Sequence, residues 1–251
     1  MSRRVRVGAF GVGAVGLAAL LVWALRGLPA FGHPRPQVPY AATVNHVAVP
    51  QREATNVVMA VTFDYRGLDT LGEEFILFAA AVATTLLLRV QRTEEEGPED
   101  DPHGRDTSDA LRALGVALVG PAVLLGLYVI SHGQLTPGGG FQGGVVVSAG
   151  ILLVFVAGSS VALRRISPLP LVEATEAVAA GALALMAVGG LIFGVAFFFN
   201  FLPQGSPGSL LSGGTIALGS LAVGFEVAGA FTLILTEFVD QRTVHMRMTE
   251  R

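Results

Sequence analysis

Six long apolar stretches dominate this sequence and limit what it can fold into. They are residues 5–28, 71–88, 111–130, 143–163, 174–199 and 213–238. Each has about the 20 residues that an α-helix needs to cross the hydrocarbon core of a bilayer. The apolar residues are continuous and do not alternate with polar ones, so the stretches predict helices and not barrel strands. The expected fold is an all-α membrane protein with about six transmembrane helices.

The composition agrees with this prediction. Hydrophobic residues make up 52% of the 251 residues and charged residues only 14%, whereas soluble domains carry about 25% charge. The chain has no cysteine, which excludes disulfides, thiolate catalysis and Cys-bound metal centres, and its five histidines form no close ligand pair. The net charge of −3 gives no reason to expect nucleic acid as a partner. We therefore expect no cofactor, no metal site and no catalytic residues.

The arginines predict the orientation, because positively charged residues favour the cytoplasmic side of a membrane. All 16 basic residues are arginine. With the N-terminus inside, 12 of them lie on the cytoplasmic side and 4 lie outside. Both termini are therefore expected in the cytoplasm, in a multi-pass protein of the cell (plasma or inner) membrane. The first stretch follows Arg3, Arg4 and Arg6 and is interpreted as a retained helix, with a signal peptide as the alternative.

A polar segment divides the chain. Residues 91–109 hold eight carboxylates with glycine and proline and have no apolar periodicity, which is typical of a disordered cytoplasmic linker. The linker separates a two-helix module, residues 1–90, from a four-helix module, residues 110–251. Residues 31–59 are not expected to cross the membrane. Their first part is too rich in proline for a helix, and the part that follows is expected to lie along the interface or to re-enter.

Asp69 and Glu73 are the first candidates for an ion path. They are four residues apart at the start of the second stretch, so they share one face of a helix. A carboxylate at the membrane edge can hold a proton or a hydrated cation. Thr70 and Glu73 also fit a capping box, in which they would close the first turn of a helix that starts there. The two interpretations are compatible, and both stay open.

Glu226 is the third candidate for the ion path. It lies near the middle of the sixth stretch, where an acid costs about 2.5–3.5 kcal/mol. Every arginine lies at or outside a stretch boundary. Glu226 must therefore be protonated, hydrated, bound to a cation or paired with a neighbouring subunit. The alternative is a neutral acid hydrogen-bonded to a carbonyl or hydroxyl group. Glu173, Glu176 and Glu237 lie nearer the ends of stretches, where we expect structural roles.

The segment SHGQLTPGGGFQGG predicts a tight reversal between the third and fourth helices. Five glycines and one proline fall within eight residues, and glycine permits the positive φ angles that such a turn needs. The segment lacks the lysine and the spacing of a phosphate-binding loop. A titrating His132 is possible near neutral pH, but a helix-end hydrogen-bonding role is favoured. The candidate structural residues of this loop are His132, Pro137, Gly138, Gly139, Gly140 and Phe141.

Three runs of sequence resemble subunits of Mrp-type multisubunit cation/proton antiporters. FDYRGLDTLGEEFILFAAAVATTLLLR resembles the C-terminal end of the large A-type subunit, a module that related membrane-bound hydrogenases carry as a separate small protein. HGQLTPGGGFQGGVVVSAGILLVF and GTIALGSLAVGFEVAGAFTLIL resemble the first hairpin and the last helix of the B-type, MnhB-like subunit. The chain thus resembles a fusion of the A-type tail with the MnhB-like subunit. It departs from the family at Glu74, where the family usually turns apolar, and at Ser220, near which many MnhB-like subunits carry an aspartate.

The resemblance implies a non-catalytic subunit of an antiporter in which protons enter and Na⁺ or another monovalent cation leaves. Its partners would be other Mrp-type or complex I-like membrane subunits. Glu73 maps onto the family's candidate for the ion path, and Pro137 and Phe141 would shape the loop of the MnhB-like module. Two alternatives stay open: a membrane-arm subunit of an ion-translocating hydrogenase or related redox complex, and a purely structural scaffold.

Overall fold

The structure, a computed structural model, describes residues 3–27, 40–89, 108–157 and 160–249. The chain divides into two compact units, Met1–Thr43 and Val44–Arg251. Five helices are long and apolar enough to cross a membrane, and the shorter apolar segment Val7–Trp23 lies in the first unit. All the regular structure in the described residues is helical, so the prediction of an all-α, multi-pass membrane protein is confirmed.

The first unit contains helix α1 (Arg3–Leu25), which carries the first of the six predicted stretches. Its side chains from Val7 to Trp23 are exposed. A helix with apolar side chains all around it is suited to a surrounding of lipid or of other helices. The proline-rich residues 31–39 lie outside the described part of the chain.

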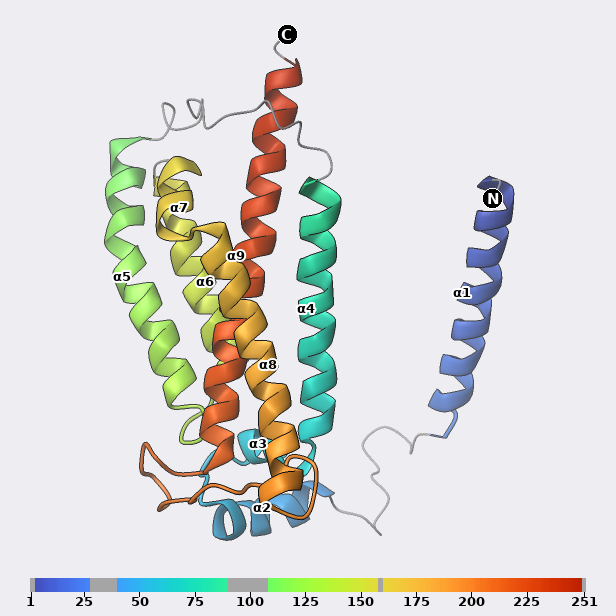
Figure 1. Cartoon of the computed structure of the whole chain (residues 1–251), viewed down its shortest axis with the longest axis vertical. Helices are drawn as coiled ribbons and strands as arrows, with labels where there is room; N and C mark the ends of the chain where they lie inside the picture. Colours follow the sequence, from blue (N-terminus) through green and yellow to red (C-terminus); the bar gives the residue numbers. More distant parts are fainter. Residues whose placement is uncertain (1–2, 28–39, 90–107, 158–159, 250–251) are drawn as a thin grey trace. The chain divides into compact units, whose positions relative to one another are not determined.

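The second unit is a bundle built around the long helix α9 (Figure 1). Helix α9 packs against α4, α6 and α8, while α5 packs mainly against α6. The bundle helices are α4 (Gly67–Arg89), α5 (Asp109–Ser131), α6 (Gly140–Ala157), α8 (Leu169–Phe193) and α9 (Thr215–Thr249). Shorter helices are α2 (Tyr40–Arg52), which crosses the boundary between the two units, α3 (Val57–Ala60), the π-helix η1 (Val61–Tyr65) and α7 (Ser160–Ile166).

Glycines bring α6 into backbone contact with both of its neighbours. A Cβ atom on Gly144 would lie 2.6 Å from the carbonyl oxygen of Gly224 in α9. A Cβ on Gly143, on the other side of α6, would lie 2.6 Å from the carbonyl oxygen of Gly126 in α5. Small residues at such positions let membrane helices approach closely. The last glycines of the predicted reversal therefore belong to the first turns of α6, while Gly139, with φ 144°, stays in the turn.

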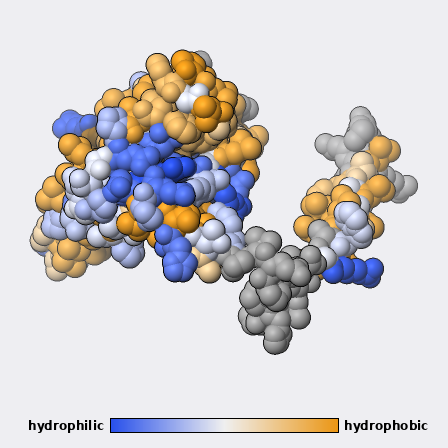
Figure 2. All heavy atoms as spheres, turned by 90° about the horizontal axis from the view of Figure 1, so that it is seen from below, coloured by the Kyte–Doolittle hydropathy of each residue, from blue (hydrophilic) through white to orange (hydrophobic). Residues whose placement is uncertain are grey.

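One end of the bundle carries α3, η1 and the turn between α5 and α6. The core extends into this end, where Met59 and Phe63 pack with Leu183, Ile216 and Val223. Hydrophilic side chains gather on the face of this end, and hydrophobic ones border it (Figure 2). This is the pattern expected where a bundle leaves the membrane, and residues 53–65 lie there without crossing.

Two predicted stretches end earlier than hydropathy indicates. The fifth was expected over residues 174–199, but α8 runs from Leu169 to Phe193. At Gly194 the backbone leaves the helix with an extended φ of −133°, and the chain folds back so that Phe198 N–H donates to Ala187 O at 3.2 Å. The fourth, expected over residues 143–163, consists of α6 and the short α7, and residues 158–159 between them lie outside the described part.

Candidate functional site

Three glutamates lie inside the bundle on three helices that pack together. Glu74 on α4 is 4% exposed, Glu176 on α8 is 2% exposed and Glu226 on α9 is 0% exposed. At about 1.5 Å per residue, Glu74 lies about 10 Å from the start of α4 and Glu226 about 16 Å from the start of α9. Glu176 lies about 10 Å from the start of α8, which runs antiparallel to the other two helices (Figure 1). The order across the bundle is therefore Glu74, Glu226, Glu176.

Neighbours in this order interact electrostatically. The carboxyl group of Glu226 interacts with that of Glu74 on one side and with that of Glu176 on the other. The approach of α8 to α9 at this depth depends on Gly229, one turn beyond Glu226, because a Cβ there would lie 3.1 Å from Cβ of Glu176. We refer to Glu74, Glu226 and Glu176 as the acid line.

The acid line has unsatisfied oxygen atoms. Both carboxyl oxygens of Glu226, Oε2 of Glu74 and Oε1 of Glu176 have no hydrogen-bond partner among the described residues. Leaving a buried polar group unpaired costs about 1–3 kcal/mol. The acid line therefore destabilises the fold, and stability does not explain why these acids are buried. It is not a chelating site, because no three His, Cys, Asp or Glu side chains in the described ranges could hold one metal ion. Separate carboxyl groups at successive depths suit stepwise proton transfer.

Of the three predicted ion-path residues, the structure places only Glu226 in this line. Asp69 and Glu73 are exposed on α4, and Asp69 pairs with Arg66. The predicted capping box is wrong, because α4 begins at Gly67 and the hydroxyl group of Thr70 donates to Thr62 O at 2.7 Å. Glu73 therefore faces the surroundings of this chain and Glu74 faces its core.

Sequence reasoning missed Glu74 and Glu176. A signal for Glu74 was present in the sequence, because small or polar residues recur at spacings of four and seven: Thr70, Glu74, Ala81 and Thr85. These four residues are buried in the structure. This face contains position 74 and not position 73. Glu176 is seven residues before the fully buried Leu183, on the same face of α8. Its place near the start of a stretch suggested a structural role, but the packing of α8 against α9 buries it beside Glu226.

The turn between α5 and α6 is tied to the segment that precedes α3. Asn56 donates from Nδ2 to the carbonyl oxygens of Gly133 and Thr136, both at 2.8 Å. Its Oδ1 accepts from Val58 N at 3.1 Å as the N-cap of α3. The hydroxyl group of Thr55 donates to Leu135 O at 2.7 Å. Residues far apart in the sequence thus form one hydrogen-bonded end of the bundle.

The other predicted loop residues lie in or beside this turn. His132 caps the C-terminus of α5, and its Nδ1 lies 3.0 Å from Tyr128 O, as expected of a helix-end residue. Pro137 is exposed. Phe141 lies in the first turn of α6, and its ring meets the ring of Phe231 edge-on at a centroid distance of 6.2 Å.

An ion pair lies at the same end, outside the spans. Arg52 Nε is 2.7 Å from Asp64 Oδ2, and the Asp64 side chain is 5% exposed. Burial raises the pKa of Asp64 above its ordinary value, and the ion pair and hydrogen bond with Arg52 oppose this shift only in part. Part of the stability of this end therefore depends on pH.

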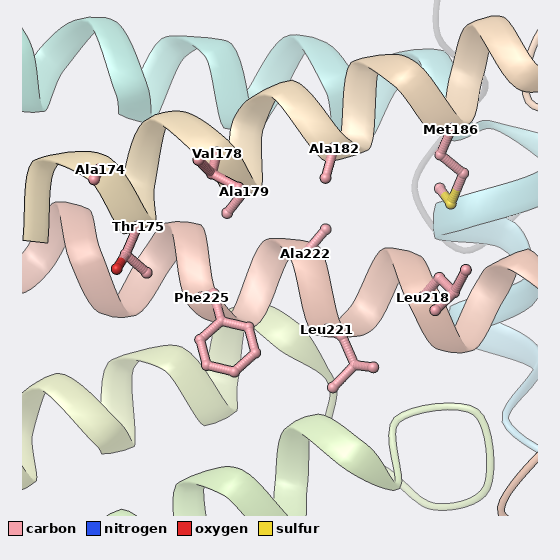
Figure 3. Close-up of a pocket in the computed structure, with 10 residues that line it drawn as sticks. All are labelled: Ala174, Thr175, Val178, Ala179, Ala182, Met186, Leu218, Leu221, Ala222 and Phe225. Carbon is pink, nitrogen blue, oxygen red and sulfur yellow. The ribbon is translucent and has the colours of Figure 1, made fainter. Parts of the chain in front are cut away.

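A groove between α8 and α9 differs in chemistry from the acid line. It has a volume of about 550 Å³, and the side chains of both helices that point into it are apolar except for Thr175 (Figure 3). The hydroxyl group of Thr175 donates to Leu171 O within its own helix. With no ionisable group in its wall, this groove offers nothing that would carry an ion.

Fold and site together define a multi-pass membrane protein whose bundle encloses a line of acids. A family model described as a domain related to the MnhB subunit of Na⁺/H⁺ antiporter matches residues 110–233. The chain is therefore an MnhB-like membrane subunit of an Mrp-like antiporter or of a related respiratory membrane complex, and the resemblance to Mrp-type subunits is confirmed.

Two sequence relatives extend this finding. An uncharacterized protein of Methanocaldococcus jannaschii is 29% identical over 206 residues, which cover 73% of this chain and 77% of that protein. A probable K⁺/H⁺ antiporter A/B subunit of Rhizobium meliloti is 33% identical over 128 residues, which cover 42% of this chain and 12% of that protein.

Two solved structures have the same fold. One is a chain of the membrane-bound sulfane sulfur reductase, an archaeal respiratory membrane complex, with a TM-score of 0.70 and 25% identity. The match covers 92% of this chain and 97% of that one. The other is a chain of the Mrp complex of a Dietzia species, with a TM-score of 0.67 and 26% identity, covering 94% of this chain and 26% of that one.

Proposed function

We propose that this chain is a non-catalytic subunit of a monovalent cation/proton antiporter and that its acid line carries protons. The observation that carries the proposal is the placement of Glu74, Glu226 and Glu176 at three depths of one bundle. Acids inside a membrane are expensive and mark ion or proton pathways by default. The transported ions are H⁺ and Na⁺ or another monovalent cation. The partners are other Mrp-type or complex I-like membrane subunits, as the match to a chain of an Mrp complex supports.

The arrangement of the line suits a relay in which one carboxyl group passes its proton to the next through bridging water, since these oxygens have no hydrogen-bond partner among the described residues. Two ionised carboxylates repel each other strongly in a medium of low dielectric constant. A proton that leaves Glu74 is therefore taken up by ionised Glu226, and ionised Glu176 takes it from Glu226 in turn. Each step moves the proton along the line. No two neighbouring acids are charged at once if Glu74 is reprotonated and Glu176 has released its own proton before Glu226 passes its proton on.

We also propose roles for the predicted candidates outside the line. Glu73 and Asp69 lie on the exposed face of α4, where a partner protein of the complex would complete a path for the cation. The turn with Pro137 and Phe141 would close the outer end against that partner. These roles rest on the resemblance to the family and on the exposure of the side chains.

The chain further joins two modules in this proposal. Residues 1–90 correspond to the tail of the large A-type subunit, residues 91–109 to a cytoplasmic linker and residues 110–251 to the MnhB-like subunit. The family match to residues 110–233 supports the last assignment. The relative named as an antiporter A/B subunit supports the combination. In the folded chain α4 packs against α8 and α9, so the modules share one core from Val44 onward.

Substitution of neighbouring glutamates tests the proposed path. Glu74→Gln and Glu226→Gln keep the side-chain size but cannot accept or release a proton, so both are expected to abolish cation-driven proton movement in inverted membrane vesicles. Native gel electrophoresis checks that the complex assembles, and Phe225→Leu, at an exposed neighbour, is the control. Wild-type transport in both glutamine variants contradicts the relay, and loss of assembly in both supports a scaffold. Full transport in Glu73→Gln would exclude Glu73 from the ion path and would leave the proposal for the acid line unchanged.

A second candidate function is a membrane subunit of a redox-driven ion pump. The observation that favours it is the match along 97% of a chain of the sulfane sulfur reductase. Affinity purification in mild detergent, followed by mass spectrometry, separates the two. Large antiporter-like subunits without redox proteins support the antiporter, and iron–sulfur or nickel-binding subunits support the redox complex.

A further inference from the structure

A cavity lies beside Glu176, between α4, α8 and α9. Its volume is about 220 Å³, and its wall includes Thr85, Glu173, Glu176, Ala177 and Leu233. It is separate from the apolar groove of Figure 3, with which it shares no lining residue. Two carboxyl groups and a hydroxyl group therefore meet in one small space.

The wall provides hydrogen-bonding atoms that the protein leaves unused. Thr85 is 4% exposed, and its hydroxyl group has no partner among the described residues, as is true of Oε1 of Glu176. A water molecule occupies about 30 Å³ in the liquid and needs two to four polar partners in a cavity. The cavity is large enough for several waters. Thr85, Glu173 and Glu176 offer polar groups to hold them, and the rest of the wall, which includes Phe78, Val82 and Leu86, is apolar.

The cavity lies close to the edge of the membrane. Helix α8 has 25 residues, so its length of about 37 Å exceeds the hydrocarbon core of about 30 Å by a few ångströms at each end. Glu173 lies about 6 Å from the start of α8, near the edge of the hydrocarbon, and Glu176 lies about one turn deeper. The arginine distribution predicts that this end of α8 faces the cytoplasm.

We propose that this cavity is a water-filled entrance through which protons exchange between the cytoplasm and Glu176. The inference rests on the proposed function, because it gives the acid line its cytoplasmic end. A hydronium ion in the cavity transfers its proton to ionised Glu176 and becomes water, and the neutral acid then passes the proton to Glu226. Movement outward reverses these steps. The charged groups that face Glu176 are Glu173 from its own helix and Glu226 from α9, while Thr85 on α4 contributes a hydroxyl group that orients water.

Thiol labelling tests whether the cavity is wet. The chain has no cysteine, so a single introduced cysteine reports its own position without background from this chain. We expect Thr85→Cys in the assembled complex to react with a small, charged, membrane-impermeant thiol reagent added on the cytoplasmic side. The control is Leu183→Cys, on the same bundle but 0% exposed and outside the cavity wall, which is expected to stay unmodified. Absence of labelling at Thr85→Cys, or labelling only from the outer side, overturns the proposal.

Transport measurements then test whether the wet cavity is used. Glu176→Gln is expected to lower proton movement at least tenfold in an assembled complex, and modification of Thr85→Cys is expected to block it. Wild-type transport in Glu176→Gln overturns the entrance. That result also removes Glu176 from the relay, whereas wild-type transport in Glu74→Gln and Glu226→Gln contradicts the rest of the relay. Labelling does not depend on transport, so the two proposals fail separately.

Discussion

Replacing Glu226 by leucine is expected to stabilise the protein while it abolishes transport. The side chain is 0% exposed, and neither of its oxygens has a hydrogen-bond partner in the described part of the chain. Leucine has a similar size and removes both unpaired atoms, which recovers about 1–3 kcal/mol. We therefore expect the free energy of unfolding to rise by about 2 kcal/mol, which corresponds to an increase in Tm of about 4–8 °C for a chain of this size.

Thermal unfolding of the purified complex and transport in vesicles check both halves of this prediction. Glu226→Gln keeps a polar group in the same place, so it is expected to lose transport without the gain in Tm. Phe225→Leu, at a position that is 45% exposed, is expected to change neither quantity by much. A lower Tm in Glu226→Leu would refute the reasoning, since it would mean that the carboxyl group supports the fold. Retained transport in that variant would remove Glu226 from the path.

Three further predictions concern packing, the bundle end and pH. Gly144→Ala is expected to destabilise the protein by about 1–3 kcal/mol because the added Cβ meets the backbone of α9. Gly181→Ala, whose added Cβ has nothing within 4 Å, is expected to be neutral or stabilising. Tm measurements compare the two variants. Asn56→Ala removes an N-cap and two hydrogen bonds to the turn, so it is expected to cost about 2–4 kcal/mol in chemical unfolding. Because the pKa of Asp64 is raised above 3.8, its contribution to stability is present below that pH and is lost as the pH rises through the raised value. Asp64→Asn is therefore expected to flatten the fall of Tm over this range, and an unchanged pH profile would contradict the shift.

The spans were predictable because length and continuous hydropathy determine what can cross a bilayer. The helix starts were less predictable. Thr70 fits a capping box in sequence, yet its hydroxyl group bonds to Thr62 O, because η1 packs against the start of α4. Likewise the apolar residues 194–199 continue the hydropathy of α8, but the backbone leaves the helix at Gly194. Local patterns do not record such tertiary contacts.

The acid line was only partly predictable for a related reason. An acid in the middle of a span is costly on any face of the helix, so the position of Glu226 in the sequence was enough to make it a candidate. Glu73 and Glu74 are adjacent, and only the buried face of α4 separates an exposed acid from a core one. Glu176 is near the start of α8, and its burial depends on the close approach at Gly229 of another helix. The line exists because three helices pack together, which no single stretch of sequence contains.

Infrared difference spectroscopy of the purified complex tests most directly whether the acid line carries protons. It compares the carbonyl-stretching bands of protonated carboxylic acids before and after addition of Na⁺ or another monovalent cation. The account predicts a cation-induced difference band that disappears in Glu226→Gln and remains in Phe225→Leu. A difference band that persists unchanged in Glu226→Gln, together with unchanged transport, would contradict it.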